Sequence, residues 1–143
     1  MKIGIFDSGL GGLAIIRDIL KILPEYGYVY LSDNARVPYG GRSSKIIHQF
    51  TERAVDFLLR KQNCVLVIVA CNTATAVALR KIQRGYLPKN FPKKRGFRVF
   101  LLRLQPLFLY LRSHGLQQNR RKWAPHFEGC LRLLRTLRRE DAF

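Results

Sequence analysis

The residue with the clearest chemical potential is Cys71, which follows a continuous apolar run and precedes the polar residues 72–75. A thiol between a strand end and a helix start lies near unpaired backbone N–H groups and the positive end of the helix dipole. Both favour the thiolate, which can act as a base or as a nucleophile. A cysteine without such context is more often a small buried hydrophobe, and Cys64, inside the apolar run, fits that description. For Cys71 the polar neighbours favour a functional role, because they cannot all stay unpaired in a core.

A second candidate is Asp7, which ends a short apolar run and is followed by Ser8-Gly9-Leu10-Gly11-Gly12. Two interpretations of this carboxylate stay open. It can cap the backbone N–H groups of the glycine turn, or it can orient or help to deprotonate a group close to Cys71. The glycines could also cradle an anion, but their spacing matches neither the dinucleotide-binding nor the phosphate-loop pattern. A nucleotide site is therefore disfavoured.

Other polar residues give weaker signals. Arg36 can pair with a substrate carboxylate, but a loop arginine is more often solvated, so we leave it outside the predicted site. His48 lies in a helix pattern, where a single histidine is usually exposed or satisfied. The odd number of cysteines, without a paired motif, argues against a disulfide framework, and no spacing of His, Cys, Asp and Glu indicates a metal site. We expect no metal.

Alternating strand and helix patterns explain how these residues come together. Apolar runs at residues 3–6, 28–31 and 64–70 predict strands, and helical periodicity follows each of them, at 13–23, 44–62 and 73–82. The order βαβαβα predicts an α/β fold, with a parallel sheet flanked by helices and right-handed crossovers. Ligands of such sheets bind at the carboxyl ends of the strands. We therefore expect the loops at 7–9, 33–41 and 71–73 to converge at one edge.

The composition bounds the class of protein. The 143 residues carry a formal charge of +17, and 48% of them are hydrophobic. That apolar share is too high for a disordered polyelectrolyte, so most of the chain should fold as one domain. No apolar run approaches the roughly 20 residues that cross a bilayer, and the start of the chain lacks a signal-peptide layout. We expect a cytoplasmic protein without a membrane partner.

The composition changes near Arg84. Residues 1–84 contain 10 Ile and 7 Val, whereas residues 85–143 contain no Ile, one Val and 12 Leu, with 14 basic against 3 acidic residues. The β-branched residues Ile and Val pack well in a buried parallel sheet. We therefore predict an α/β domain at 1–84 and an irregular basic tail at 85–143. Residues 85–96, with two prolines and two glycines, are predicted to be a loop or linker.

The basic tail leaves alternatives open. Its arginines interleave with aromatic residues, a combination that binds single-stranded nucleic acid, so a polyanion or nucleic-acid binding module is the rival hypothesis. No recognition motif accompanies the charge, and we expect no specific nucleic-acid partner. A third alternative is aggregation through uncovered apolar surface.

Three motifs, FDSGLGGL at 6–13, SDNARVPYG at 32–40 and VACNTAT at 69–75, resemble the amino-terminal domain of bacterial glutamate racemase over residues 1–84. The resemblance implies cofactor-independent interconversion of L- and D-glutamate, which supplies peptidoglycan synthesis, and it leaves a homo-oligomer open. In this family two cysteines flank the α-carbon and exchange its proton. The resemblance implies that Cys71 is the first of them, and Asp7 remains the second catalytic candidate for the reason given above. The implied substrate-binding residues are Asp7, Ser8, Tyr39, Gly40, Asn72 and Thr73.

The family's opposing cysteine belongs to a Gly-Cys-Thr-His segment that this chain lacks. Cys130 follows Gly129 but precedes Leu131 and Arg132, so the second catalytic role is not assigned to it. We hypothesise that the tail is translated out of frame after a frameshift near Arg84, which leaves a truncated and impaired racemase.

This hypothesis predicts that another reading frame of the coding DNA, downstream of codon 84, encodes the missing Gly-Cys-Thr-His segment. Sequencing that DNA tests the prediction. If no frame encodes the segment, the frameshift hypothesis fails.

Overall fold

The computed structural model describes residues 1–92 and 100–103, whose centre is a parallel sheet. Within these residues the sheet has four strands in the order β2-β1-β3-β4, and each neighbouring pair runs parallel. The strands are β1 (Lys2–Asp7), β2 (Gly27–Ser32), β3 (Leu66–Val69) and β4 (Phe100–Arg103). The predicted parallel α/β architecture is confirmed, with β1 in an interior position of the sheet.

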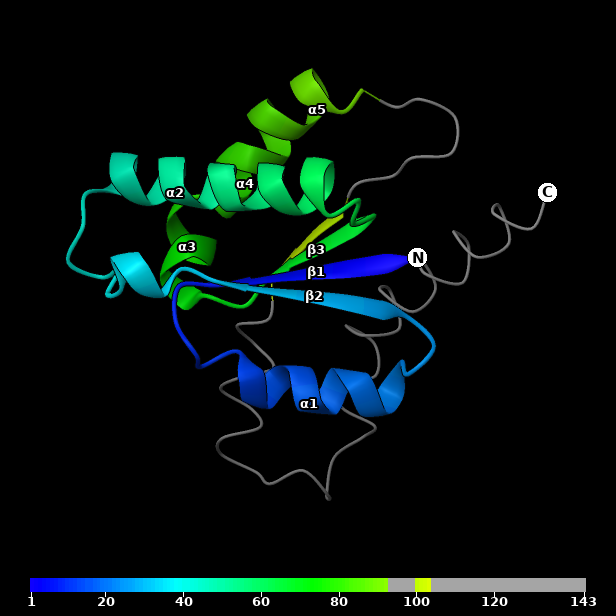
Figure 1. Cartoon of the computed structure of the whole chain (residues 1–143). Coiled ribbons are helices and arrows are strands. Elements are labelled where there is room, and N and C mark those ends of the chain that lie inside the picture. Colours follow the sequence, from blue (N-terminus) through cyan, green and yellow to red (C-terminus); the bar gives the residue numbers. More distant parts are fainter. Residues whose placement is uncertain (93–99, 104–143) are drawn as a thin grey trace.

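Helices lie on both faces of the sheet (Figure 1). On one face lies α1 (Leu13–Ile22). On the other lie α2 (Ser44–Asp56), extended by a π-helical turn at Phe57–Lys61, and then α3 (Asn72–Val77), α4 (Leu79–Lys81) and α5 (Leu87–Asn90). A π-helical turn at Ile82–Tyr86 joins α4 to α5, and a short 3-10 helix at Asn34–Arg36 follows β2. None of the helices in the described ranges is long and apolar enough to cross a membrane.

The alternation of side chains along the strands builds a core on each face. Ile3 and Ile5 of β1 pack with α1, whereas Phe6 packs with the helices of the opposite face. Gly4 also points to that opposite face, where a Cβ atom would lie 3.2 Å from both Leu58 and the Cys64 sulfur. Because Gly4 has no side chain, the turn after α2 can approach the sheet closely at this point. Cys64 is buried as predicted, and burial raises the pKa of its thiol.

The register of the strands brings the three predicted loops to one edge. Asp7 pairs with Ser32 of β2, and Phe6 pairs with Val69 of β3. Two more backbone hydrogen bonds continue the ladder into the loops, from Asp33 N–H to the Asp7 carbonyl (3.1 Å) and from Ala70 N–H to the Phe6 carbonyl (2.8 Å). The predicted convergence of these loops at the carboxyl edge is thereby confirmed.

The predicted loop at 85–96 is wrong for its first part, because the chain stays helical to Asn90. Pro88 lies in the first turn of α5, where a helix does not need the N–H that proline lacks. The tail also contributes β4, although the sequence suggested no strand there. Residues 93–99 and the rest of the tail lie outside the described residues.

Polar and aromatic contacts attach this helical extension to α2. The Tyr86 hydroxyl donates to the Asp56 carboxylate, which also accepts from Arg60 Nε (2.6 Å). The Arg60 guanidinium lies over the ring of Phe91 (4.8 Å to its centroid) and donates to Asn90 Oδ1 (3.3 Å). Because these contacts cross the boundary suggested by composition, and β4 pairs with β3 in the same sheet, we propose that the domain extends beyond Arg84.

Tyr86→Phe tests whether the extension belongs to the domain. Burial, and then the hydrogen bond to Asp56, raises the pKa of Tyr86 from 10.0 to about 12. A raised folded pKa means that the contribution of this phenol to stability is complete below pH 10.0 and is lost as the pH rises through about 12. We expect the variant to lower the free energy of unfolding at neutral pH by about 1 kcal/mol. The free energy of unfolding of the variant should also fall less steeply than that of the wild type as the pH rises through about 12.

Urea denaturation followed by circular dichroism, repeated across this pH range, measures both effects. Tyr30 and Tyr39 also have raised pKa values and stay in the variant, so a residual alkaline loss remains. A variant whose stability falls with pH as steeply as that of the wild type would contradict the attachment.

Candidate active site

Cys71 is the N-cap of α3, directly after β3, as the sequence predicted. Its sulfur accepts a hydrogen bond from Ala74 N–H (3.4 Å) and lies 3.1 Å from Ser8 Oγ. The residue is only 5% exposed. The sulfur is thus largely shielded from water and faces one backbone N–H and one hydroxyl.

Of the polar residues after Cys71, one side chain is hydrogen-bonded within the protein and two have no hydrogen bond to the described residues. The buried Thr75 hydroxyl donates to the Val69 carbonyl (3.2 Å), which satisfies it within the strand–helix junction. Asn72 is exposed and Thr73 is half-buried. Neither side chain hydrogen-bonds to another residue in the described ranges.

The buried carboxylate of Asp7 holds the glycine turn. Its Oδ2 accepts from Gly12 N–H (2.6 Å) and from the Tyr30 hydroxyl (3.4 Å). Of the two interpretations of Asp7, these contacts support the capping one. Ser8 follows Asp7 directly, and its hydroxyl faces the Cys71 sulfur.

The loop after β2 brings a buried phenol to the same edge. Tyr39 is 2% exposed, and its hydroxyl donates to Asp33 Oδ2 (2.7 Å). Burial raises its pKa, and so do the hydrogen bond and charge of Asp33 and the charge of Cys71, against a smaller opposing effect of Arg36. The phenol therefore stays protonated and remains a donor.

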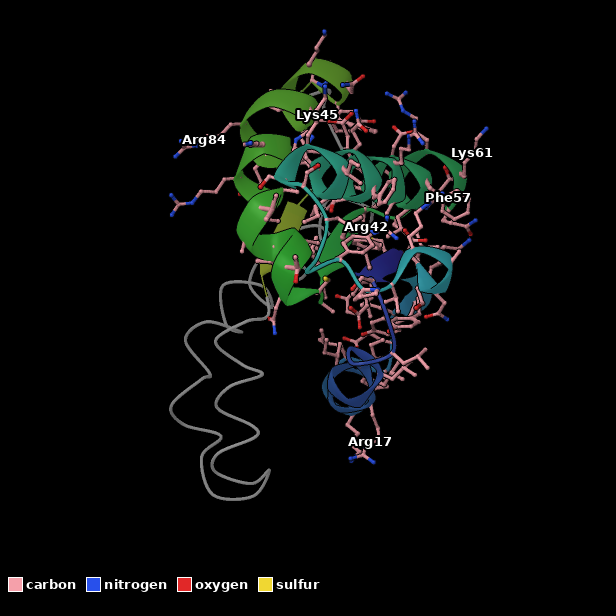
Figure 2. All side chains as sticks on the ribbon, turned by 90° about the vertical axis from the view of Figure 1, so that its left-hand side faces the viewer. Arg17, Arg42, Lys45, Phe57, Lys61 and Arg84 are labelled. Atoms are coloured by element: carbon pink, nitrogen blue, oxygen red, sulfur yellow. The ribbon has the colours of Figure 1, made fainter. Side chains whose placement is uncertain are left out.

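Two arginines and an aromatic ring hold this loop in place. Arg36 Nη1 donates to both carboxylate oxygens of Asp33 (3.1 and 3.0 Å), and Arg42 Nε donates to the Arg36 carbonyl (3.0 Å). Both guanidinium groups lie over the ring of Phe50 in α2, at 4.7 and 5.6 Å from its centroid. Figure 2 views the edge of the sheet where these loops meet, with Arg42 near its middle and Arg17 and Arg84 at its periphery.

The structure thus brings the Ser8 hydroxyl into direct contact with the Cys71 sulfur, with Asp7 beside Ser8 in sequence and Tyr39 in the same buried cluster as Cys71. Gly40 is exposed beside Tyr39, with open space where a side chain would be. No group of three or more His, Cys, Asp and Glu residues that could hold a metal ion occurs in the part of the chain that the structure describes.

Sequence reasoning missed the residues that support this edge: Tyr30, Ser32, Asp33 and Phe50. The signal for the first two was available, because Tyr30 and Ser32 alternate along β2 and must share one face of the sheet. Arg36 was set aside as solvated, whereas its guanidinium pairs with Asp33.

The fold and this edge define a parallel α/β domain with a thiol-based site at the carboxyl ends of its strands. Over three quarters of its length the chain is homologous to glutamate racemases, in the region of their N-terminal domain. It is 44% identical to the glutamate racemase of a Jannaschia species and 46% identical to that of Ruegeria pomeroyi. Each alignment covers 107 residues, which are 75% of this chain and 38% of the relative. No family model matches the chain.

Solved glutamate racemases share this fold. The structure from Aquifex pyrophilus matches with a TM-score of 0.57 at 39% identity, over 71% of this chain and 36% of that one. The Escherichia coli enzyme, solved with L-glutamate and the activator UDP-MurNAc-ala, matches with a TM-score of 0.60 at 29% identity, over 71% and 34% of the chains. The Francisella tularensis enzyme, solved with D-glutamate, gives 0.59 at 34% identity, over 72% and 35%.

The extent of the similarity corrects the predicted limit of 1–84. An alignment of 107 residues that starts no earlier than Met1 reaches at least residue 107, so the homology continues past Arg84. The chain nevertheless spans little more than a third of the length of the curated relatives it matches.

Gly12→Ala tests the close packing of the turn that Asp7 caps. A Cβ atom at position 12 would lie 3.0 Å from the Ala70 Cβ and 3.1 Å from Asp7 Oδ2, and both neighbours are tied to the sheet. We expect the substitution to lower the free energy of unfolding by about 1–3 kcal/mol, as measured by urea denaturation.

Gly11→Ala is the matched control, because its Cβ would meet Asp7 Oδ2 at an ordinary 3.8 Å. Its expected effect stays within about 0.5 kcal/mol. Equal effects of the two substitutions would show that the turn does not depend on close packing against Asp7.

Proposed function

We propose that this domain carries one half of a cofactor-independent glutamate racemase site, in which the Cys71 thiolate takes the α-proton of glutamate. The observation that carries the proposal is the contact of the Cys71 sulfur with Ser8 Oγ at the carboxyl edge of the sheet, in a chain homologous to glutamate racemases. The proposal extends to a cytoplasmic location and a role in supplying D-glutamate for peptidoglycan, and hence in cell-wall biogenesis and cell shape.

The chemistry requires a shielded base. The α-proton of an amino acid is a weak acid, so its removal needs a base with little hydration, close to donors that stabilise the resulting negative charge. Cys71 meets the first condition by its burial, and the N-terminus of α3 provides backbone donors beside it. In the proposed step the C–H bond breaks, the proton goes to sulfur, and its electron pair stays on the α-carbon.

Glutamate binding is proposed for the groups around Cys71. Asn72 and Thr73 offer unpaired polar side chains, Ser8 offers a hydroxyl, and Tyr39 and Gly40 border the same edge. The Escherichia coli and Francisella tularensis relatives were solved with L-glutamate and D-glutamate, respectively. Asp7 acts in this proposal by positioning Ser8 and the glycine turn.

Inversion of the α-carbon needs a proton from the opposite face, and Cys71 can serve only one. The sequence contains no Gly-Cys-Thr-His segment to provide the second thiol, and Cys130 lies outside the described residues. We therefore propose a half-site that binds glutamate and does not sustain racemisation. The rival polyanion-binding function rests on tail residues outside the described ranges, and no observation favours it.

Nuclear magnetic resonance tests this proposal. Addition of L-glutamate to the labelled protein should shift the amide signals of residues 7–9, 39–40 and 71–73, and the same loops should respond less to glutarate, which lacks only the amino group. Incubation with glutamate in D2O should give little or no α-deuteration and no racemic product.

Cys71→Ala tests whether any residual exchange of the α-proton depends on this thiol. Cys64→Ala is its matched control, since Cys64 is buried before the start of β3. Exchange that Cys71→Ala abolishes and Cys64→Ala retains supports the assigned base. An absence of shifts with glutamate would overturn the binding site, and sustained racemisation would overturn the half-site.

A further inference from the structure

The side chains of β2 reach across the sheet edge to the loop that carries Ser8. The Tyr30 hydroxyl donates to the Gly9 carbonyl (2.9 Å) and lies 3.4 Å from Asp7 Oδ2, and the Ser32 hydroxyl donates to the same Gly9 carbonyl (2.7 Å). Tyr30 therefore contacts the residue before Ser8 and the residue after it. No other side chain in the described ranges has hydrogen bonds to both.

We propose that Tyr30 is a positioning residue, whose hydroxyl fixes the loop on both sides of Ser8 so that Ser8 Oγ stays in contact with the Cys71 sulfur. Ser8 itself has one side-chain partner among the described residues, and this partner is Cys71 at 3.1 Å. Its orientation therefore depends on the backbone that carries it, and Tyr30 holds that backbone.

The environment of Tyr30 suits a permanent donor. Burial raises its pKa, and the charge and hydrogen bond of Asp7 raise it further, so the phenol keeps its proton at physiological pH. Its ring packs against the core on the α1 side of the sheet, which limits the movement of the hydroxyl. Tyr30 is thus anchored by apolar contacts and presents its hydroxyl to the loop.

The inference is independent of the identity of the substrate, although it concerns the site proposed above. Its consequence is a property of the free protein: the Ser8 hydroxyl can donate to the sulfur and favour the thiolate. Loss of this contact should raise the pH at which Cys71 becomes reactive. A failure of glutamate binding would leave this prediction standing.

Tyr30→Phe removes the hydroxyl and keeps the ring. We measure the rate of alkylation of Cys71 by iodoacetamide across a pH range, with peptide mass spectrometry to separate this cysteine from the others. The expected result is an upward shift of the pH midpoint by about one pH unit, the size associated with one hydrogen bond to the charged form. The midpoint is informative because a change in access alone alters the rate without moving it.

Tyr28→Phe is the matched control. Tyr28 lies on the same strand and the same face of the sheet, and its hydroxyl also donates to a backbone carbonyl, that of Leu23 (2.7 Å), at the opposite end of the strand. Both substitutions should lower the free energy of unfolding by similar amounts, whereas only Tyr30→Phe should move the Cys71 midpoint. Equal shifts in both variants would reduce Tyr30 to a structural residue and overturn the proposal.

A double-mutant cycle with Ser8→Ala tests whether Tyr30 acts through Ser8. The titratable residues of the predicted site besides Cys71 are Tyr39, which shares its buried cluster, and Asp7, at the end of β1, and the cycle leaves both in place. In the Ser8→Ala background, Tyr30→Phe should produce no further shift of the midpoint. A full additional shift there would show that Tyr30 acts on Cys71 by another route, which would contradict the proposal.

Discussion

The arrangement of the molecule depends on the hydrogen-bonded register of β1 between β2 and β3. The ladder continues past the strands, through Asp33 N–H to the Asp7 carbonyl and Ala70 N–H to the Phe6 carbonyl. A shift of one residue in either pairing would turn the side chains of a strand to the opposite face. It would also separate Ser8 from Cys71, which are 63 residues apart in sequence and meet only because both strands end at the same level.

Polar groups at this edge are organised around two carboxylates with different tasks. Asp7 is buried and accepts from a backbone amide and a phenol, and so it shapes the glycine turn. Asp33 accepts from Tyr39 and Arg36 and holds the loop after β2. Each carboxylate is thus engaged within the protein, which is why the function proposed above assigns proton transfer to the thiol of Cys71.

The sequence predicted the βαβαβα order, the converging loops and the position of Cys71, because each depends on local periodicity and on the geometry of parallel sheets. It failed at residues 85–90, where composition suggested a loop and Pro88 instead occupies the first turn of a helix. It also missed Tyr30 and Phe50. Each looked like an ordinary core residue, and its role depends on partners that are distant in sequence, Gly9 and Arg36.

The same geometry that prepares Cys71 for chemistry also limits what the domain can do alone. The sulfur lies at the carboxyl edge of the sheet, and in the proposed function only one face of the α-carbon can point toward it. Racemisation requires proton transfer at both faces, and a second donor must stand opposite, beyond the edge of this sheet. Under the function proposed above, a domain of this architecture binds and orients an amino acid, whereas inversion of its stereochemistry needs a group that faces the sheet from outside.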